Sequence, residues 1–237
     1  MSVFFTDFTG ASDPSLVPIP FDSVVEGAGC DCLYDATNGI AGGPCERSLI
    51  LATGADAYGI RALSEDIALA NRKIRLTLAQ WKCDVVPFAG ISGSRSGLLR
   101  LRNPTPTNLC TLELVKVDTT NARFRVRYDP GASTADGTTN IVAATNYKIA
   151  MEYDGRAGLE TLTLFVNDLQ EAQITGLGAS VESVHDLLCG AIAITGIPAV
   201  TINYYSDNIN LTTMSAAVAT SASRQHGTVR VNQVRPL

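Results

Sequence analysis

Apolar and polar side chains alternate with a period of two along much of this chain. In YKIAMEYD, residues 147–154, Ile149 and Met151 fall on one face together with the tyrosines, and Lys148 and Glu152 fall on the other. This period is typical of a half-buried β-strand, because successive side chains of a strand point to opposite faces. The stretch therefore predicts a strand. The glycines and the aspartate of DGRAG, which follows, predict a tight turn.

The same alternation recurs between short segments rich in Gly, Pro, Asn and Asp. It predicts strands over 72–81, 97–103, 110–118, 122–129, 147–154, 159–167, 170–177, 191–196, 199–211 and 227–234. Short strands at this spacing are typical of an antiparallel sandwich or barrel. We expect few and short helices, with SEDIALANRK from Ser64 and SVESVHDLL from Ser180 as the two candidates, either of which could instead be a loop.

Three regions lie outside this alternation. Residues 9–48 are rich in Gly, Pro, Asp and Cys and predict a long ordered loop or small edge strands, and residues 129–146 predict an exposed loop. Residues 212–226 are small and polar and lead to the last predicted strand. We therefore expect a sandwich over 1–211 and a C-terminal extension over 212–237 that packs on a neighbouring subunit.

The segment NYKIAMEYDGRAGLETLTLFVNDLQEA, residues 146–172, resembles the central hairpins of laminin-G-like, concanavalin A-like jelly rolls. In those domains a strand ending in Tyr-Asp-Gly leads into a strand ending in Val-Asn-Gly or Val-Asp-Gly, and here Asp168 replaces the last glycine. VFFTDFTGAS and INYYSDNINL are similar to the first and a late strand of such domains. The resemblance spans roughly residues 3–211 and implies an all-β, antiparallel jelly-roll β-sandwich.

Composition narrows the classes of function. With 237 residues, 46% of them apolar, the chain can bury a large core, and its net charge of -5 argues against a general nucleic-acid binder. The N-terminus has no basic region ahead of an apolar stretch, so we expect synthesis in the cytoplasm and no secretory signal. The longest apolar run, residues 187–202, is interrupted by two glycines and a proline, so no membrane span is expected.

The six cysteines are expected to be mostly reduced and partly buried. Cys30, Cys32 and Cys45 lie in a Gly-rich region, but their spacing does not match that of a zinc site. Asp154, Asp168 and Asp207 are candidate calcium donors, with turn capping as the alternative. We expect no metal and no cofactor.

Catalytic motifs are also missing from the sequence. Glu152, Asp154 and Glu160 resemble the three acids of a glycoside hydrolase strand, but a turn interrupts them. His185 and His226 are the two histidines, and no nucleophile elbow accompanies either. We therefore expect no enzymatic activity and assign no catalytic residue.

Arginines form the most suggestive polar pattern. Arg100 and Arg102 on one predicted strand, and Arg123, Arg125 and Arg127 on another, would share a surface if the two strands are neighbours. Such a surface suits an acidic partner, a phosphate backbone or a sulfated glycan. The alternative is a solvated face with interleaved acids such as Glu113.

Most aromatic residues are expected in the core. Trp81, Tyr147, Tyr153 and Tyr204 alternate in phase with the apolar positions, whereas Tyr205 does not. We therefore add Tyr205 to the five arginines as a candidate partner-binding residue.

The first functional hypothesis is a non-enzymatic structural protein of a virus particle, a bacteriophage capsid decoration (cement) protein or a tail-associated protein. Its partners would be other virion proteins such as the major capsid protein and further copies of this chain, and its location the virion. The alternative is a carbohydrate-binding module or lectin, whose partner is a glycan. The fold that the sequence resembles hosts both classes, so it does not decide between them.

Overall fold

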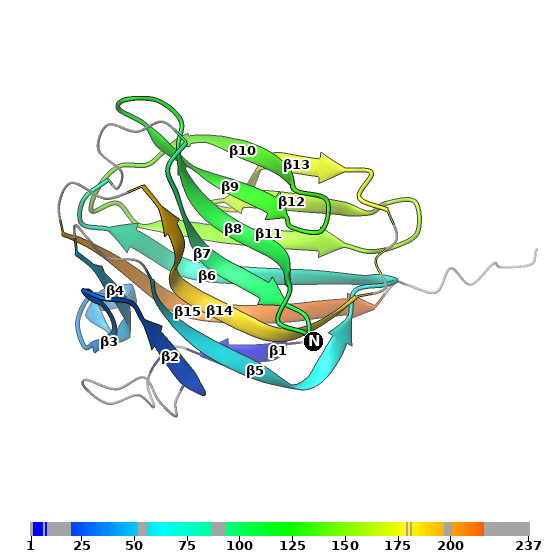
Figure 1. Ribbon diagram of the computed structural model, residues 1–237, viewed down its shortest axis with the longest axis horizontal. Helices are drawn as coiled ribbons and strands as arrows, with labels where there is room; N and C mark the ends of the chain where they lie inside the picture. The colour runs from blue at the N-terminus through cyan, green and yellow to red at the C-terminus, as the bar shows by residue number, and fades with distance from the viewer. Residues whose placement is uncertain are drawn as a thin grey trace, which may run out of the picture.

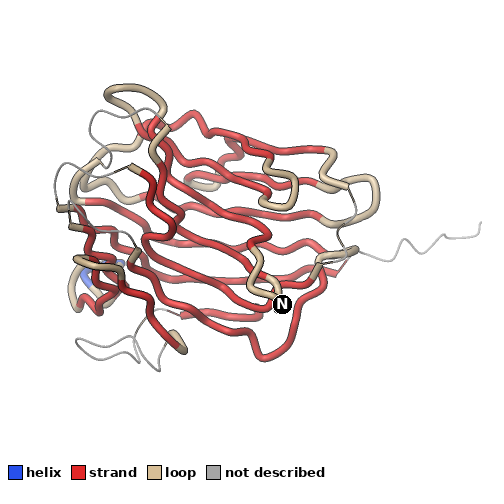
Figure 2. Tube along the Cα trace, viewed as in Figure 1, coloured by secondary structure: helices blue, strands red, loops and turns tan. Residues whose placement is uncertain are grey.

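The computed structural model describes residues 2–6, 8, 20–51, 56–86, 93–178, 180, 182–196 and 201–215. Strands dominate these residues, and a single turn of 3-10 helix, η1, interrupts them (Figure 2). In chain order the elements are β1 Ser2–Thr6, β2 Ser23–Glu26, β3 Cys30–Asp35, η1 Ile40–Gly42, β4 Cys45–Ile50, β5 Ala57–Ala68, β6 Arg72–Cys83, β7 Arg95–Arg102, β8 Asn108–Lys116, β9 Ala122–Tyr128, β10 Ser133–Asn140, β11 Tyr147–Asp154, β12 Thr161–Val166, β13 Leu169–Thr175, β14 Ser183–Thr195 and β15 Ile202–Ser215.

The strands form two sheets that pack face to face (Figure 1). The eight-stranded sheet has the order β13-β12-β11-β6-β15-β4-β3, with β1 beside the second half of β15. The seven-stranded sheet has the order β10-β9-β8-β7-β14-β5-β2. All pairings among the described strands are antiparallel. The predicted all-β, antiparallel jelly-roll sandwich is confirmed.

The core lies between the two sheets and is built from the inward positions of the alternating strands. Trp81, Tyr147, Tyr153 and Tyr204 are all buried there, as predicted. The Trp81 ring lies 5.3 Å from the ring of Phe124 on the seven-stranded sheet, so an edge-to-face aromatic pair joins the two layers. The outward positions of the same strands carry the polar residues.

Strands β11, β12 and β13 form two successive hairpins with the predicted strands and turns. Asn167 and Asp168 both have positive φ, 51° and 66°, as the centre of a two-residue hairpin turn requires. In the preceding turn Gly158 has the predicted positive φ of 77°, but Gly155 does not. Gly155 is needed for another reason, because a Cβ there would lie 2.1 Å from the carbonyl oxygen of Leu69.

Both predicted helices are wrong. The segment from Ser64 forms the end of β5 and the start of β6, joined by a turn in which Asn71 has a φ of 55°. The segment from Ser180 leads into β14, which pairs with β5 on one side and β7 on the other. The ladder hydrogen bonds and the burial of Val184 and Leu187 override the weak helical periodicity.

Two predicted irregular regions are partly wrong. Residues 129–146 contain β10, which forms the edge of the seven-stranded sheet. In the part of 9–48 that the structure describes, the prediction of small edge strands is confirmed, because β2 and β3 are the edges of the two sheets. β15 runs to Ser215 and so includes the start of the predicted C-terminal extension. The rest of that extension, with the strand predicted over 227–234, lies outside the described residues.

All six cysteines are buried and none forms a disulfide. Their reduced state stays a prediction. In the described part of the chain no three His, Cys, Asp or Glu side chains converge as metal ligands. The described helical residues include no helix long and apolar enough to cross a membrane.

A candidate carbohydrate groove on the eight-stranded sheet

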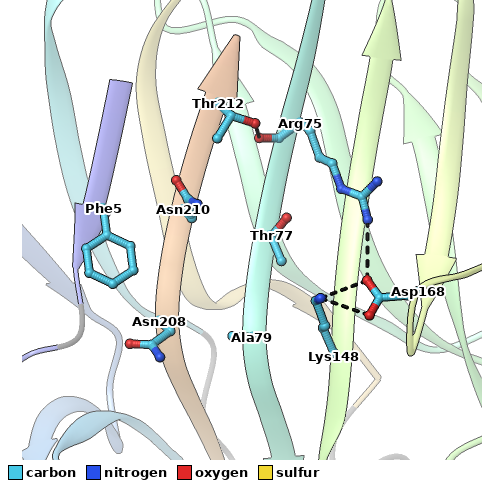
Figure 3. Close-up of a pocket in the computed structure, with 9 residues that line it drawn as sticks. All are labelled: Phe5, Arg75, Thr77, Ala79, Lys148, Asp168, Asn208, Asn210 and Thr212. Atoms are coloured by element: carbon cyan, nitrogen blue, oxygen red, sulfur yellow. Dashed lines mark hydrogen bonds and ion pairs between the residues drawn. The ribbon is translucent and has the colours of Figure 1, made fainter. Parts of the chain in front are cut away.

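The outward face of the eight-stranded sheet holds a hollow of about 520 Å³, which we call the sheet groove (Figure 3). It runs across β1, β15, β6 and β11 to the turn between β12 and β13. Its width over the four strands is roughly 14 Å at the usual spacing of neighbouring strands. The lining residues are Phe5, Arg75, Thr77, Ala79, Lys148, Asp168, Asn208, Asn210 and Thr212.

Side-chain size along the strands shapes this groove. Thr77 and Ala79 point outward from β6 at the centre of the sheet, and their short side chains form a low floor. Cross-strand pairing places Asn210 of β15 beside Thr77. Longer side chains, Phe5 on one side and Lys148 on the other, form the walls (Figure 3).

Arg75 lies at the wall of the groove. Its described contacts fix the guanidinium in position without using all of its hydrogen-bond donors. Its Cζ lies 4.3 Å from the centre of the Phe165 ring, a cation–π contact that fixes the group in place. Among the described residues, its nearest carboxylates are Glu152 at 3.6 Å and Asp168 at 3.8 Å. Both distances are too long for hydrogen bonds, so these contacts leave the guanidinium N–H groups that a ligand can use.

Lys148 and Asp168 form the second polar pair of the groove. The Lys148 Nζ lies 2.9 Å from Asp168 Oδ2 and 2.8 Å from Oδ1. Nearby, Lys73 pairs with Glu152 at 2.7 Å. Three cations therefore face two carboxylates on this part of the sheet, and the excess positive charge lies at Arg75.

Phe5 and the asparagines give the groove a mixed character. The Phe5 side chain is 56% exposed, whereas phenylalanine side chains are usually buried. An exposed aromatic ring can pack against the apolar face of a sugar, and Asn208, Asn210 and Thr212 can bond its hydroxyl groups. The groove thus combines an aromatic platform, amide and hydroxyl groups, and a cation.

The fold is that of a concanavalin A-like jelly roll. The endo-β-1,4-glucuronan lyase of the fungus Trichoderma reesei matches with a TM-score of 0.63 and 10% identity, over 89% of this chain and 95% of the lyase. The cellulose-induced protein Cip1 matches with a TM-score of 0.57 and 9% identity, over 88% and 96% of the two chains. The alginate lyase AlyC3 matches with a TM-score of 0.52 and 7% identity, over 72% and 75%. No family model matches the sequence, and no curated protein does.

These likenesses correct two expectations from the sequence. The hypothesis of a virion structural protein and the expectation of no enzymatic activity are both contradicted, because two of these three solved structures are polysaccharide lyases. The carbohydrate-binding alternative agrees better with them. At identities near 10% they show a shared fold, so the activity of this chain has to be argued from its own residues.

The five predicted arginines lie on the opposite face of the molecule, on the outside of the seven-stranded sheet. β8 separates β7 from β9, and across it Arg100, Thr111 and Arg127 stand in one row. The two strands are therefore not neighbours, which was the condition for a shared surface, but their arginines lie on the same face of the sheet. Arg100 donates to the Thr111 hydroxyl at 3.2 Å, and the Arg127 Nε lies 2.9 Å from Asp129 Oδ1.

Acids and an amide accompany the remaining arginines of this face. Arg102 pairs with Asp186 at 2.7 Å, and Arg123 donates to the Asn140 side chain at 2.9 Å. Arg125 bonds Asp136 and lies 3.6 Å from the buried Glu113. This pattern is the interleaved face that the sequence left as the alternative. A partner for these arginines stays a prediction.

Tyr205 does not lie with the arginines. It faces outward on the eight-stranded sheet, opposite Lys82 on β6, whose Nζ is 5.0 Å from the tyrosine ring centre. Its role in binding also stays a prediction.

The candidate calcium donors lie apart in the structure. Asp154 pairs with Arg156, Asp168 with Lys148, and Asp207 Oδ2 accepts a hydrogen bond from the backbone N–H of Ile40 at 2.8 Å. Each aspartate serves a local turn, loop or ion pair.

Two further candidates from the sequence are placed as follows. His185 Nδ1 lies 2.7 Å from Asp66 Oδ1, and this hydrogen bond raises the pKa of His185 above its usual value. Glu160 lines a shallow hollow of about 410 Å³ beside the DGRAG turn. His226 lies outside the described residues.

Sequence reasoning missed the sheet groove, although part of its signal was present. Arg75 and Thr77 alternate with apolar residues in β6, and Asn210 and Thr212 do the same in β15. Two strands with polar residues of this kind at spacing two indicate an outward face that can bond a sugar. Their adjacency could not be read from the sequence, because β6 and β15 are far apart along the chain.

Proposed function

We propose that the protein binds an acidic polysaccharide in the sheet groove. The observation that carries this proposal is the guanidinium of Arg75, which keeps unused N–H groups beside a groove with an excess positive charge. A uronate carboxylate is the group on a glycan that such a guanidinium binds best. The exposed Phe5 ring and the asparagines supply the contacts that a sugar ring and its hydroxyls need.

The comparisons support this reading at the level of the fold. Two proteins that share the fold are named for acidic polysaccharides, glucuronan and alginate. The finer likeness to laminin-G-like domains, read from the hairpin around residues 146–172, fits a glycan-binding role as well.

The test is a calorimetric titration with glucuronan and alginate oligosaccharides, with uncharged cello-oligosaccharides as the comparison ligand. Arg75→Gln and Lys148→Gln are each expected to weaken acidic-glycan binding about tenfold, since a hydrogen bond to a charged group contributes about 1.5 kcal/mol or more. Arg123→Gln on the opposite face removes the same charge and serves as the matched control. Asp168→Asn raises the charge of the groove by one and is expected to tighten binding.

Two results would overturn the proposal. One is the absence of binding to any acidic glycan at low ionic strength, where charge pairing is strongest. The other is an equal loss of affinity in Arg75→Gln and Arg123→Gln, which would mean that overall charge and not the groove controls binding.

A second candidate function is cleavage of the bound glycan by β-elimination. It is favoured by the position of Asp168 in the same groove as Arg75, since elimination beside a carboxylate needs a base for the carbon-bound proton and a cation on the carboxylate. The described lining contains no histidine or tyrosine, and its lysine, Lys148, pairs as a cation with Asp168, so the Asp168 carboxylate is the candidate base. The ultraviolet absorbance of the unsaturated product measures this reaction. Binding without any rise in absorbance would leave recognition as the function.

A further inference from the structure

A loop divides the outward face of the eight-stranded sheet. Gln80 and Asp207 occupy outward positions of β6 and β15, yet they are only 6% and 4% exposed. The loop between β3 and β4 covers them: the Gln80 side chain donates to the Asn38 carbonyl at 2.9 Å, and Asp207 accepts from the Ile40 N–H at 2.8 Å. The loop therefore forms a wall across this face of the sheet.

A second hollow lies beyond this wall, and we call it the rim pocket. Its volume is about 160 Å³. It is formed by the end of β6, the start of β15, the loop between β3 and β4, and the loop that precedes β11. The lining residues are Asn38, Lys82, Cys83, Asp84, Ala144 and Tyr205.

Lys82 is held in a fixed position in this pocket. Its Nζ lies 5.0 Å from the centre of the Tyr205 ring and donates to Asn38 Oδ1 at 3.2 Å. The Asn38 side chain is itself fixed, because its Nδ2 donates to both carboxylate oxygens of Asp35, at 3.1 and 3.0 Å. An ammonium group has three donors, and the described contacts of Lys82 use one in a hydrogen bond. The others are available to a ligand.

The charges in the rim pocket are balanced, unlike those of the sheet groove. Lys82 is the cation and Asp84 the anion among the lining residues. Asp84 accepts one hydrogen bond on each oxygen from Asn203, at 2.8 and 2.5 Å, and each carboxylate oxygen has a further lone pair. A fixed donor, an acceptor and an aromatic ring around a neutral hollow fit a ligand with several hydroxyl groups and no net charge.

We propose that the rim pocket is a second carbohydrate site, which takes one uncharged sugar residue. Tyr205 supplies the aromatic surface, Lys82 donates to hydroxyl oxygens, and Asp84 accepts from hydroxyl protons. The site does not depend on the sheet groove, because no residue lines both hollows.

The test uses nuclear magnetic resonance spectra of the full chain labelled with ¹⁵N. The spectra are recorded with cellobiose, maltose, lactose and mannobiose as neutral probes and with glucuronan disaccharide as the acidic one. At least one neutral probe is expected to shift the backbone amide signals of Asn38, Lys82 and Tyr205. Tyr205→Ala and Lys82→Met are each expected to weaken that binding about tenfold.

The controls separate this proposal from the function proposed above. Lys148→Gln alters the sheet groove and is expected to leave neutral-sugar binding unchanged. Both rim-pocket variants alter outward positions, and an unchanged amide spectrum outside the pocket shows that each is folded. The proposal is overturned if no neutral probe shifts these three amides, or if either variant binds the neutral probe as tightly as the original chain. Binding of the acidic probe alone, lost in Lys82→Met, would also overturn it and make the pocket an extension of the acidic site.

Discussion

Replacing the buried Glu46 by glutamine is expected to remove a large pH-dependent loss of stability. Glu46 lies on β4 with no exposed surface, and its Oε1 contacts the hydroxyl of Ser48. The Ser48 Oγ also lies 2.8 Å from the Ala57 carbonyl oxygen and 3.1 Å from the Ala191 backbone nitrogen. A hydroxyl has one proton and two lone pairs. If the Ala57 carbonyl takes the proton and the Ala191 N–H takes one lone pair, the contact with Glu46 is satisfied only when Glu46 donates.

With that assignment of the Ser48 proton, Glu46 is a neutral acid, and burial favours the same form. Burial raises the pKa of Glu46 to about 7, while hydrogen bonds from Ser206 and Cys32 oppose the shift. The thiols of Cys32, Cys45 and Cys189 lie close enough to interact with its charge. Burial raises the pKa of all three thiols well above the usual value, so they stay neutral, and none of these neighbours is a cation that could offset a negative charge on Glu46.

The size of the effect follows from the change in pKa. The shift from 4.5 to about 7 corresponds to about 3 kcal/mol, at 1.36 kcal/mol for each pH unit. Because the pKa is raised in the folded state, the folded protein binds more protons than the unfolded chain between these two values. The stabilising contribution of Glu46 is therefore complete below about pH 4.5 and is lost as the pH rises through about 7.

Urea unfolding of the original chain and of Glu46→Gln at a series of pH values measures this difference directly. Glutamine keeps the shape and a donor for Ser48 but has no charge, so the two proteins should be similarly stable near pH 4.5. Above about pH 8 the variant should be more stable by about 3 kcal/mol. Comparing the two curves cancels the titration of all other groups. Glu65→Gln, at an exposed position of β5, controls for the change in net charge. Parallel curves for Glu46→Gln and the original chain would refute the reasoning.

Three further predictions concern residues outside the sheet groove. Gly155→Ala is expected to destabilise the fold by about 2 to 3 kcal/mol in urea unfolding, because its Cβ would lie 2.1 Å from the Leu69 carbonyl oxygen; a loss below about 0.5 kcal/mol would contradict this. Glu171→Ala is expected to cost about 2 kcal/mol in the same assay, since the Glu171 carboxylate accepts from two backbone N–H groups of β10 at 2.9 and 3.1 Å and ties the edges of the two sheets together. Asp66→Asn is expected to lower the pKa of His185 in a proton magnetic resonance titration, and an unchanged midpoint would mean that their 2.7 Å hydrogen bond does not raise it.

Local patterns in the sequence predicted much of the fold. The alternation over 147–166 and the pair Asn167 and Asp168 specify two strands and the turn between them, because the strand period and the turn conformation depend on neighbouring residues. The segment from Ser64 failed for the opposite reason. Its three consecutive polar residues, 64–66, fit the exposed positions of a helix equally well, and only pairing with β14 makes the segment a strand.

The site depends on pairings between distant parts of the chain, which sequence patterns do not encode. Arg75 on β6 becomes part of the groove because β11 lies on one side of β6 and β15 on the other. Through these two pairings Lys148 and Asn210 come to lie in the same groove as Arg75. Each residue reads as an ordinary polar position on its own strand. Strand order therefore has to be known before the groove can be found.

The two outer faces of the sandwich show why the number of cations on a face does not identify the better binding surface. The seven-stranded sheet carries the five arginines, but Arg102, Arg125 and Arg127 lie against acids, and Arg100 and Arg123 donate to the side chains of Thr111 and Asn140. The eight-stranded sheet carries fewer cations in its described strands, yet the described carboxylates near Arg75 lie beyond hydrogen-bonding distance and an aromatic ring holds its guanidinium in place. A ligand binds most tightly where donors are fixed in position and still unused. Binding there costs neither the free energy of breaking an existing ion pair nor the entropy of ordering the side chain. By this criterion the face with fewer cations is the better binding surface.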